Sequence, residues 1–177
     1  MAGLEKIKLI VMDVDGVLSD GKLYYSSVGE ELKSFNVQDG LGLTIAKKLG
    51  YELAIITGRE SAMVARRAKE LGFHYLVQNS KNKTASLQNI CKESGLDVDA
   101  VAYIGDDLND IGALSVAGFS AAPANAAADV RSRVDYVTTA RGGEGVLREV
   151  VEKIIKETGR WDDVLQVFEK EAYDAQQ

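Results

Sequence analysis

The chain has 177 residues, 46% of them hydrophobic, and a formal net charge of -6 at pH 7. This length and hydrophobic fraction suit a single core, so we expect residues 1–177 to form one domain. The negative charge argues against nucleic acid or an anionic membrane as the main partner, because both are bound through Lys and Arg side chains. The single cysteine, the charged N-terminal segment and the lack of a membrane-length apolar run lead us to expect a cytoplasmic protein.

Strand and helix patterns alternate along the chain. Residues 7–12 form a short, β-branched apolar run that is typical of a buried strand. Asp39 is expected to cap the first helix. The repeated order of strands and helices predicts an α/β fold with a parallel sheet and helices on both faces. The remaining strands are expected at 51–56, 74–77, 100–104, 119–121 and 136–138, and the helices at 40–48, 60–71, 82–94 and 145–157.

Residues 22–37, which follow the first strand, are typical of a two-stranded hairpin. Leu23, Tyr24 and Tyr25 precede a turn at 27–30, and further apolar residues follow that turn. Because apolar side chains fall on both faces, the hairpin either packs on another subunit or folds back on its own domain. The pattern alone favours neither arrangement.

Polar side chains gather where the predicted strands end, and in a parallel sheet these ends face one pocket. Several carboxylates in one pocket repel one another unless a cation is bound, and oxygen ligands suit Mg²⁺. The hydroxyl of Thr57, the backbone amide of Gly58 and the ammonium of Lys83 suit phosphate oxygens, so the site predicts phosphoryl transfer. In chain order the candidates are Asp13 and Asp15, then Thr57 and Gly58, then Lys83, and last Asp106, Asp107 and Asp110.

These residues resemble the four motifs of the haloacid dehalogenase superfamily of phosphotransferases: DVDGV, TGR, a downstream Lys and GDDLND, in this order. The segments DVDGVLSDG, NVQDGLG, ITGRES, AYIGDDLND and RGGEGVLRE resemble more closely its small capless branch, which includes the 3-deoxy-D-manno-octulosonate 8-phosphate (KDO 8-phosphate) phosphatase family. The resemblance implies a three-layer Rossmann-like sheet without a cap domain, a hairpin flap at 22–37 and a C-terminal tail at 141–177. It implies hydrolysis of KDO 8-phosphate for lipopolysaccharide precursor synthesis. It also implies a homotetramer in which a neighbouring subunit and a mobile, glycine-rich tail segment complete each site.

The resemblance assigns a role to each site residue. Asp13 would be the nucleophile that forms an aspartyl phosphate, and Asp15 would be the general acid and base. Mg²⁺ would be held by Asp13, the Asp15 carbonyl and Asp106, with Asp107 and Asp110 in supporting positions. Thr57, Gly58 and Lys83 would hold the phosphoryl group, and further substrate contacts would come from Asp15, Asn36, Val37, Gln38, Asp39, Gly40, Arg59 and Arg67.

Plainer interpretations exist for three of these cations. From the residue pattern alone, Arg59 and Arg67 are typical of surface charges on a helix. Lys81 precedes Lys83 by two residues, and two lysines so close in sequence are usually solvated surface charges. Lys83 is preferred because the family pattern has its lysine at the start of this helix.

Other substrates and other classes of protein also fit parts of the pattern. Gln38, Thr44 and Asn79 depart from the usual residues of the family, which leaves open another sialic-type sugar-acid phosphate such as KDN 9-phosphate. A non-catalytic oligomerisation module is disfavoured by the intact carboxylates and lysine. A receiver domain requires an acidic residue after the third strand, and a phosphomutase requires a cap-sized insertion between Asp20 and Asn36; the chain has neither.

Overall fold

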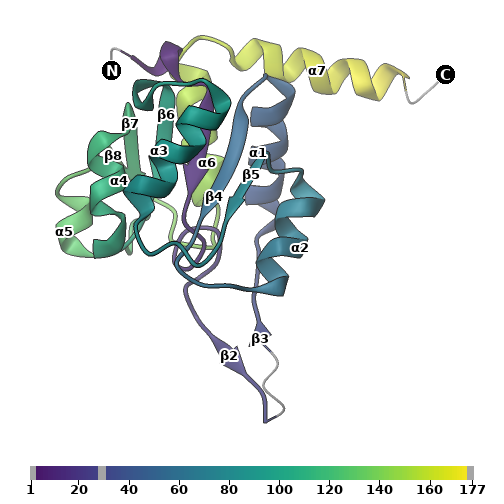
Figure 1. The fold of residues 1–177 in the computed structure, drawn as a ribbon. Helices are drawn as coiled ribbons and strands as arrows, with labels where there is room; N and C mark the ends of the chain where they lie inside the picture. Colours follow the sequence, from purple (N-terminus) through teal and green to yellow (C-terminus); the bar gives the residue numbers. More distant parts are fainter. Residues whose placement is uncertain (1–2, 28–30, 175–177) are drawn as a thin grey trace.

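The computed structural model describes residues 3–27 and 31–174, and a six-stranded sheet lies at its centre (Figure 1). Every strand pairing in this sheet is parallel, and the strand order is β5-β4-β1-β6-β7-β8. All four residues of β1 are buried, as expected for a strand that is covered on both faces. The strands are β1 (Leu9–Met12), β4 (Glu52–Ile56), β5 (Tyr75–Val77), β6 (Val101–Ile104), β7 (Phe119–Ala122) and β8 (Tyr136–Val137).

Two layers of helices cover the sheet (Figure 1). Ile10 and Met12 of β1 pack into one core cluster with α1, α2 and α6, whereas Leu9 and Val11 pack into a second cluster with α3, α4 and α5. The predicted three-layer α/β fold is therefore confirmed. The helices are α1 (Val37–Lys48), α2 (Ala62–Leu71), α3 (Lys83–Ser94), α4 (Ile111–Val116), α5 (Ala128–Arg131) and α6 (Val146–Glu157), with 3₁₀ helices at Leu4–Lys6, Val98–Ala100 and Leu108–Asp110.

The first helix begins three residues earlier than expected. Asn36 caps α1, because its side-chain oxygen accepts a hydrogen bond from the Gln38 N–H at 2.8 Å. The prediction that Asp39 caps this helix is wrong. Asp39 lies in the first turn of α1, is fully buried, and instead accepts hydrogen bonds from the first N–H groups of α6. Asn and Asp both suit a cap, so only the contact with α6 separates their roles.

The other boundaries shift by one or two residues. α2, for example, begins at Ala62 instead of residue 60, because the Ser61 hydroxyl accepts a hydrogen bond from the Val64 N–H at 3.4 Å and caps the helix there. Shifts of this size do not change which side chains follow each strand, so the expected strand ends stay in place.

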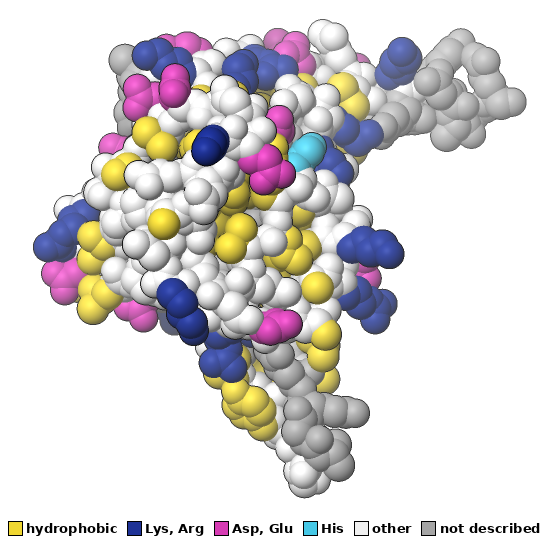
Figure 2. Space-filling view, in the orientation of Figure 1, with side chains coloured by type: hydrophobic (Ala, Val, Ile, Leu, Met, Phe, Trp, Pro, Cys, Tyr) yellow, Lys and Arg dark blue, Asp and Glu magenta, His cyan; other side chains and the backbone are white. Residues whose placement is uncertain are grey.

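The hairpin of β2 (Tyr24–Tyr25) and β3 (Glu31–Leu32) projects from the end of the sheet where the strands finish (Figure 1). Its strands are antiparallel, with Tyr24 opposite Leu32, and most of the predicted turn lies outside the described residues. Tyr24, Tyr25 and Leu32 are 47%, 66% and 63% exposed, and Figure 2 shows apolar side chains along this projection. In the described part of the chain, this hairpin is the only strand pair between β1 and α1, and no cap domain is present.

The tail comprises a glycine-rich loop at 141–145, α6, and a last helix, α7 (Trp161–Asp174). Figure 1 shows α7 at the end of the molecule opposite the hairpin. Val164 of α7 is buried in the core cluster that contains α1 and α6, whereas Leu165 is 47% exposed. Within residues 3–27 and 31–174, no helix combines the length and the apolar character needed to cross a membrane.

Candidate active site

Asp13 and Asp15 lie on the loop that leaves β1, residues 13–21, which we call the β1 loop. The Asp13 N–H donates to the Ile104 carbonyl at 3.0 Å, and the Asp13 residue is only 6% exposed. Gly16 has a φ of 93°, and a Cβ at this position would collide with the carboxylate of Asp106. Glycine therefore permits both the turn and the close approach of Asp106.

Lys83 forms an ion pair with Asp13. Asn82 caps α3 by accepting a hydrogen bond from the Ala85 N–H at 3.0 Å, which places Lys83 at the first residue of the helix. The Lys83 Nζ lies 2.8 Å from Asp13 Oδ2 and 2.8 Å from Asp110 Oδ1, and the lysine side chain is 3% exposed. Burial alone lowers the pKa of Lys83, but the two carboxylates outweigh it and raise that pKa overall. Lys83 therefore keeps its charge next to Asp13.

Asp110 connects the ends of three elements. Its Oδ1 accepts hydrogen bonds from Lys83 Nζ at 2.8 Å and from the Tyr103 hydroxyl at 2.9 Å. Its Oδ2 accepts from the backbone N–H groups of Asp106 and Asp107 at 3.2 Å and 3.4 Å. Protein donors thus engage both oxygens of this fully buried carboxylate.

Asp13, Asp106 and Asp110 form an acidic cluster whose closest ligand oxygens all lie within 4.8 Å of one another. Burial, reinforced by Asp13 and Asp110, raises the pKa of Asp106 to about 7; burial, with Asp110, raises the pKa of Asp13 to about 6. Asp106 Oδ1 is buried and has no hydrogen-bond partner. A divalent cation offsets the repulsion and supplies that partner, and carboxylate oxygens suit Mg²⁺. The donor set therefore fits a magnesium ion.

A pocket of about 180 Å³ lies at this cluster, and we call it the catalytic pocket. Thr57, which is 2% exposed, continues β4 by donating its N–H to the Val77 carbonyl at 2.9 Å, so its side chain is fixed at the strand end. The sequence predicted every residue of the lining except Asn109. The lining residues are Asp13, Asp15, Thr57, Gly58, Arg59, Asp106, Asp107 and Asn109.

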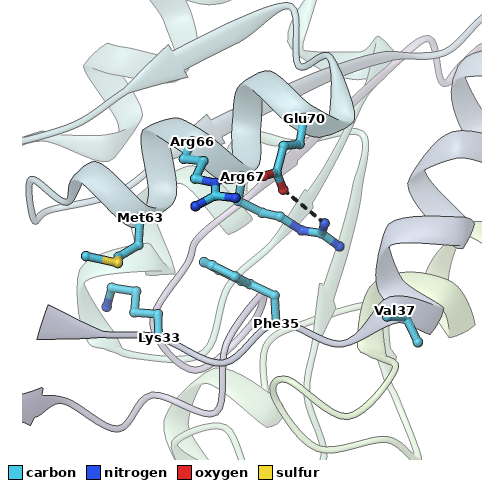
Figure 3. A pocket seen from close by; sticks show the side chains of 7 residues that line it. All are labelled: Lys33, Phe35, Val37, Met63, Arg66, Arg67 and Glu70. Carbon is cyan, nitrogen blue, oxygen red and sulfur yellow. Dashed lines mark hydrogen bonds and ion pairs between the residues drawn. The ribbon is translucent and has the colours of Figure 1, made fainter.

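A second pocket, of about 330 Å³, lies between the end of the hairpin and α2, and we call it the outer pocket (Figure 3). Arg67 Nη1 lies 3.5 Å from Glu70 Oε2, but Arg67 Nε is buried and has no hydrogen-bond partner. Arg66 and Arg67 share the single carboxylate of Glu70 in this pocket, a balance of charge that favours an anionic ligand. The outer pocket is lined by Lys33, Phe35, Val37, Met63, Arg66, Arg67 and Glu70, of which the sequence predicted Val37 and Arg67 as substrate contacts.

The remaining predicted substrate contacts, Asn36, Gln38, Asp39 and Gly40, line neither of these two pockets. Asn36 and Asp39 cap α1 and α6, as described above. Gly40 packs so closely on the Arg67 guanidinium that a Cβ would overlap it, and Gln38 is exposed on α1. Of these contacts, the one between Gly40 and Arg67 reaches a residue that lines the outer pocket.

The tail loop packs tightly on the β1 loop. Gly143 donates its N–H to the Val17 carbonyl at 2.9 Å, and Gly142 donates to Asn125 Oδ1 at 2.8 Å. A Cβ on Gly142 would overlap the Gly16 carbonyl, and one on Gly143 would overlap the backbone at residues 19–20. In this structure the glycines permit a close approach of two backbones, and the expected mobility of the tail stays a prediction.

The sequence reasoning missed Lys33. Its Nζ lies 2.5 Å from Asp15 Oδ1, and its side chain is 1% exposed. Lys33 and Phe35 are two residues apart in an extended segment, so both side chains point to one side. That alternation was the available signal, but a lysine next to an exposed hairpin is ordinarily read as a surface charge.

The fold and the site together define the class of protein. A parallel sheet carries two aspartates after a central strand, a threonine after its neighbour, and a buried lysine paired with the first aspartate. Residues 74–150 match the family model of haloacid dehalogenase-like hydrolases. The protein is accordingly a phosphoric monoester hydrolase of the haloacid dehalogenase type.

Individual relatives narrow this class. The 3-deoxy-D-manno-octulosonate 8-phosphate phosphatase of Escherichia coli (strain B / BL21-DE3) is 42% identical over 92% of this chain and 87% of its own. The corresponding phosphatase of Moraxella catarrhalis, solved with magnesium, phosphate and KDO, is 48% identical with a TM-score of 0.91, over 94% of this chain and 95% of its own. A cobalt-bound form from Haemophilus influenzae is 38% identical with a TM-score of 0.86, over 89% of this chain and 92% of its own. The chain belongs to the 3-deoxy-D-manno-octulosonate 8-phosphate phosphatase family.

Proposed function

We propose that the protein hydrolyses KDO 8-phosphate to KDO and phosphate through an aspartyl-phosphate intermediate. The observation that carries this proposal is the buried ion pair of Asp13 and Lys83 beside Asp106, whose buried oxygen lacks a partner. Relatives named for this activity match about nine-tenths of the chain. The predicted Mg²⁺ cofactor is confirmed by the acidic cluster together with the magnesium in the Moraxella catarrhalis structure.

Two displacements at phosphorus account for the reaction. In the first, a carboxylate oxygen of Asp13 attacks phosphorus, the bond to the sugar oxygen breaks, and Asp15 gives its proton to that oxygen. In the second, Asp15 takes a proton from water, the water oxygen attacks phosphorus, and phosphate leaves as Asp13 is regenerated. Thr57, Gly58 and Lys83 hold the phosphoryl oxygens throughout. Mg²⁺, when bound, offsets the charge of the carboxylates and the phosphoryl group.

The sugar acid occupies the outer pocket. The two pockets adjoin, because Lys33 lines the outer one while its ammonium contacts Asp15 in the catalytic one. Arg67 offers an unpaired buried Nε, and Arg59 lines the catalytic pocket, so both guanidinium groups are suited to the sugar-acid carboxylate. Val37 lines the same pocket, and Gly40 packs against Arg67.

Phosphate release from KDO 8-phosphate should require Mg²⁺. EDTA should reduce the rate to background and added Mg²⁺ should restore it, whereas Ca²⁺ should bind without supporting turnover because its looser coordination spoils the in-line geometry. The measurement is phosphate release from a panel that includes KDN 9-phosphate and p-nitrophenyl phosphate. Metal-independent hydrolysis would overturn the proposed metal site. Faster release from KDN 9-phosphate would make that compound the better substrate, and no release from any of these compounds would favour an oligomerisation module.

We also propose a cytoplasmic homotetramer held together by the hairpins. The exposed apolar side chains of Tyr24, Tyr25 and Leu32 support this assembly, because a two-stranded hairpin is marginal in water unless it packs on something. Leu32→Asp should therefore reduce the mass measured by light scattering from that of a tetramer. Leu165→Asp, at an apolar position of α7 that is 47% exposed, is the matched control and should leave the mass unchanged. A monomeric parent protein would disprove the assembly.

A further inference from the structure

We propose that Lys33 is a positioning residue for Asp15, so that docking of the hairpin sets the orientation of the general acid. This inference rests on the acid and base role of Asp15 in the proposed function. Lys33 lies directly after β3, on the segment that leads from the hairpin to α1. The nucleophile depends on other elements, because Asp13 is held by Lys83 of α3 and by the sheet. The two catalytic carboxylates are thus held by separate parts of the chain.

The contact between Lys33 and Asp15 is buried on the lysine side. Nζ lies 2.5 Å from Asp15 Oδ1; the lysine side chain is 1% exposed and that of Asp15 is 22% exposed. A buried ammonium needs an anionic acceptor, and Asp15 supplies it. Because Lys33 engages Oδ1, the oxygen left for proton transfer to a leaving group is Oδ2. The ion pair therefore fixes which oxygen does the chemistry.

A second hairpin contact acts on the same carboxylate through Arg59. Arg59 Nε lies 3.8 Å from Asp15 Oδ2, which is close enough to orient the oxygen electrostatically and too far for a hydrogen bond. The Tyr25 hydroxyl on β2 accepts a hydrogen bond from Arg59 Nη2 at 2.9 Å. One residue from β2 and one next to β3 thus meet the two sides of the Asp15 carboxylate, directly or through Arg59. Movement of the hairpin would therefore change the contacts at both Oδ1 and Oδ2 of Asp15.

The decisive variant is Lys33→Met, which removes the ammonium and keeps an unbranched side chain. It should lower kcat/KM by about 100-fold for KDO 8-phosphate, because the sugar alkoxide is a poor leaving group that needs a proton. For p-nitrophenyl phosphate the loss should be less than about tenfold, because p-nitrophenolate leaves without one. The ratio kcat/KM reports substrate binding and the steps up to release of the leaving group, so it includes the step that needs the acid. Lys33→Arg keeps a positive charge and should retain more of the lost activity than Lys33→Met. Lys22→Met, at a 70% exposed lysine paired with Asp20, is the control and should match the parent.

A double-mutant cycle separates positioning from direct substrate contact. Asp15→Asn should also lower kcat/KM more for KDO 8-phosphate than for p-nitrophenyl phosphate. Adding Lys33→Met to Asp15→Asn should lower kcat/KM for KDO 8-phosphate by less than about threefold more, because the acid that Lys33 positions is already gone. In thermal melts each single variant already loses the ion pair of Lys33 and Asp15, and the double variant cannot lose it twice, so the double variant should melt higher than the sum of the two losses predicts. This second readout does not depend on turnover.

The outcomes distinguish this inference from the proposed function. If Asp15→Asn lowers kcat/KM equally for both substrates, the acid role of Asp15 fails and the inference fails with it. The other outcome is that Asp15→Asn lowers kcat/KM mainly for KDO 8-phosphate. In that case only the positioning role of Lys33 is overturned if Lys33→Met raises KM alone, lowers kcat/KM equally for both substrates, or adds its full effect to that of Asp15→Asn. Selective loss with non-additive activity and non-additive melting supports it.

Discussion

Asp13→Asn should abolish turnover while the fold stays intact. The amide has nearly the shape of the carboxylate but is a poor nucleophile, so kcat should fall by about 10⁴-fold or more. The change also removes a charge whose burial is unfavourable, since burial and Asp110 raise the pKa of Asp13 to about 6. Lys83 keeps its second carboxylate partner, Asp110, at 2.8 Å. The variant should therefore unfold at the parental temperature or above it.

Phosphate release and a thermal melt on the same sample check this expectation. Asp20→Asn is the matched control, because Asp20 lies on the same loop, pairs only with the exposed Lys22 among the ion pairs described, and lines neither pocket. It should retain nearly the full rate. Parental activity in the Asp13→Asn protein would remove Asp13 from the mechanism, whereas a large fall in melting temperature would show that the side chain is needed for folding.

Asp110→Ala should destabilise the protein by about 3–5 kcal/mol, because it breaks a buried ion pair on one side only. Lys83 would keep Asp13 but lose its other carboxylate, and the Tyr103 hydroxyl and two backbone N–H groups would lose their acceptor. Activity should fall as well, since the start of α3 and the end of β6 would no longer be tied together next to Asp106.

Urea denaturation measures the change in free energy of unfolding. Asp129→Ala is the control: its carboxylate is 67% exposed and pairs with Arg133 at 3.2 Å, so its loss should cost at most about 1 kcal/mol. A cost for Asp110→Ala as small as that of the control would mean that the four hydrogen bonds at Asp110 contribute little to stability.

The sheet and the residues of the catalytic pocket could be predicted because both depend on short patterns of consecutive residues. Strands buried on both faces are continuous apolar runs, as in Leu9–Met12, and the polar residues that follow them mark the ends of the strands. The roles of Asp13, Asp15 and Asp106 in catalysis and metal binding stay predictions, although the structure brings these carboxylates to one pocket.

What could not be predicted depends on contacts between distant segments. Asn36 and Asp39 are equally good helix caps in isolation, and only the packing of α6 on α1 gives Asp39 its partners more than 100 residues away. Lys33 has the appearance of a hairpin surface charge until the fold brings Asp15 to it. The tail glycines show a need for backbone freedom but not which backbone they approach.

The contact of Gly142 and Gly143 with the β1 loop limits how this chain can evolve. Backbone atoms of the β1 loop occupy the space that a side chain at either position would need, so shortening a neighbouring side chain cannot make room. Selection at these two positions therefore acts on shape alone. Met63 and Arg66 of the outer pocket make their contacts through side chains, so a substitution there can change the pocket without moving the backbone of the β1 loop.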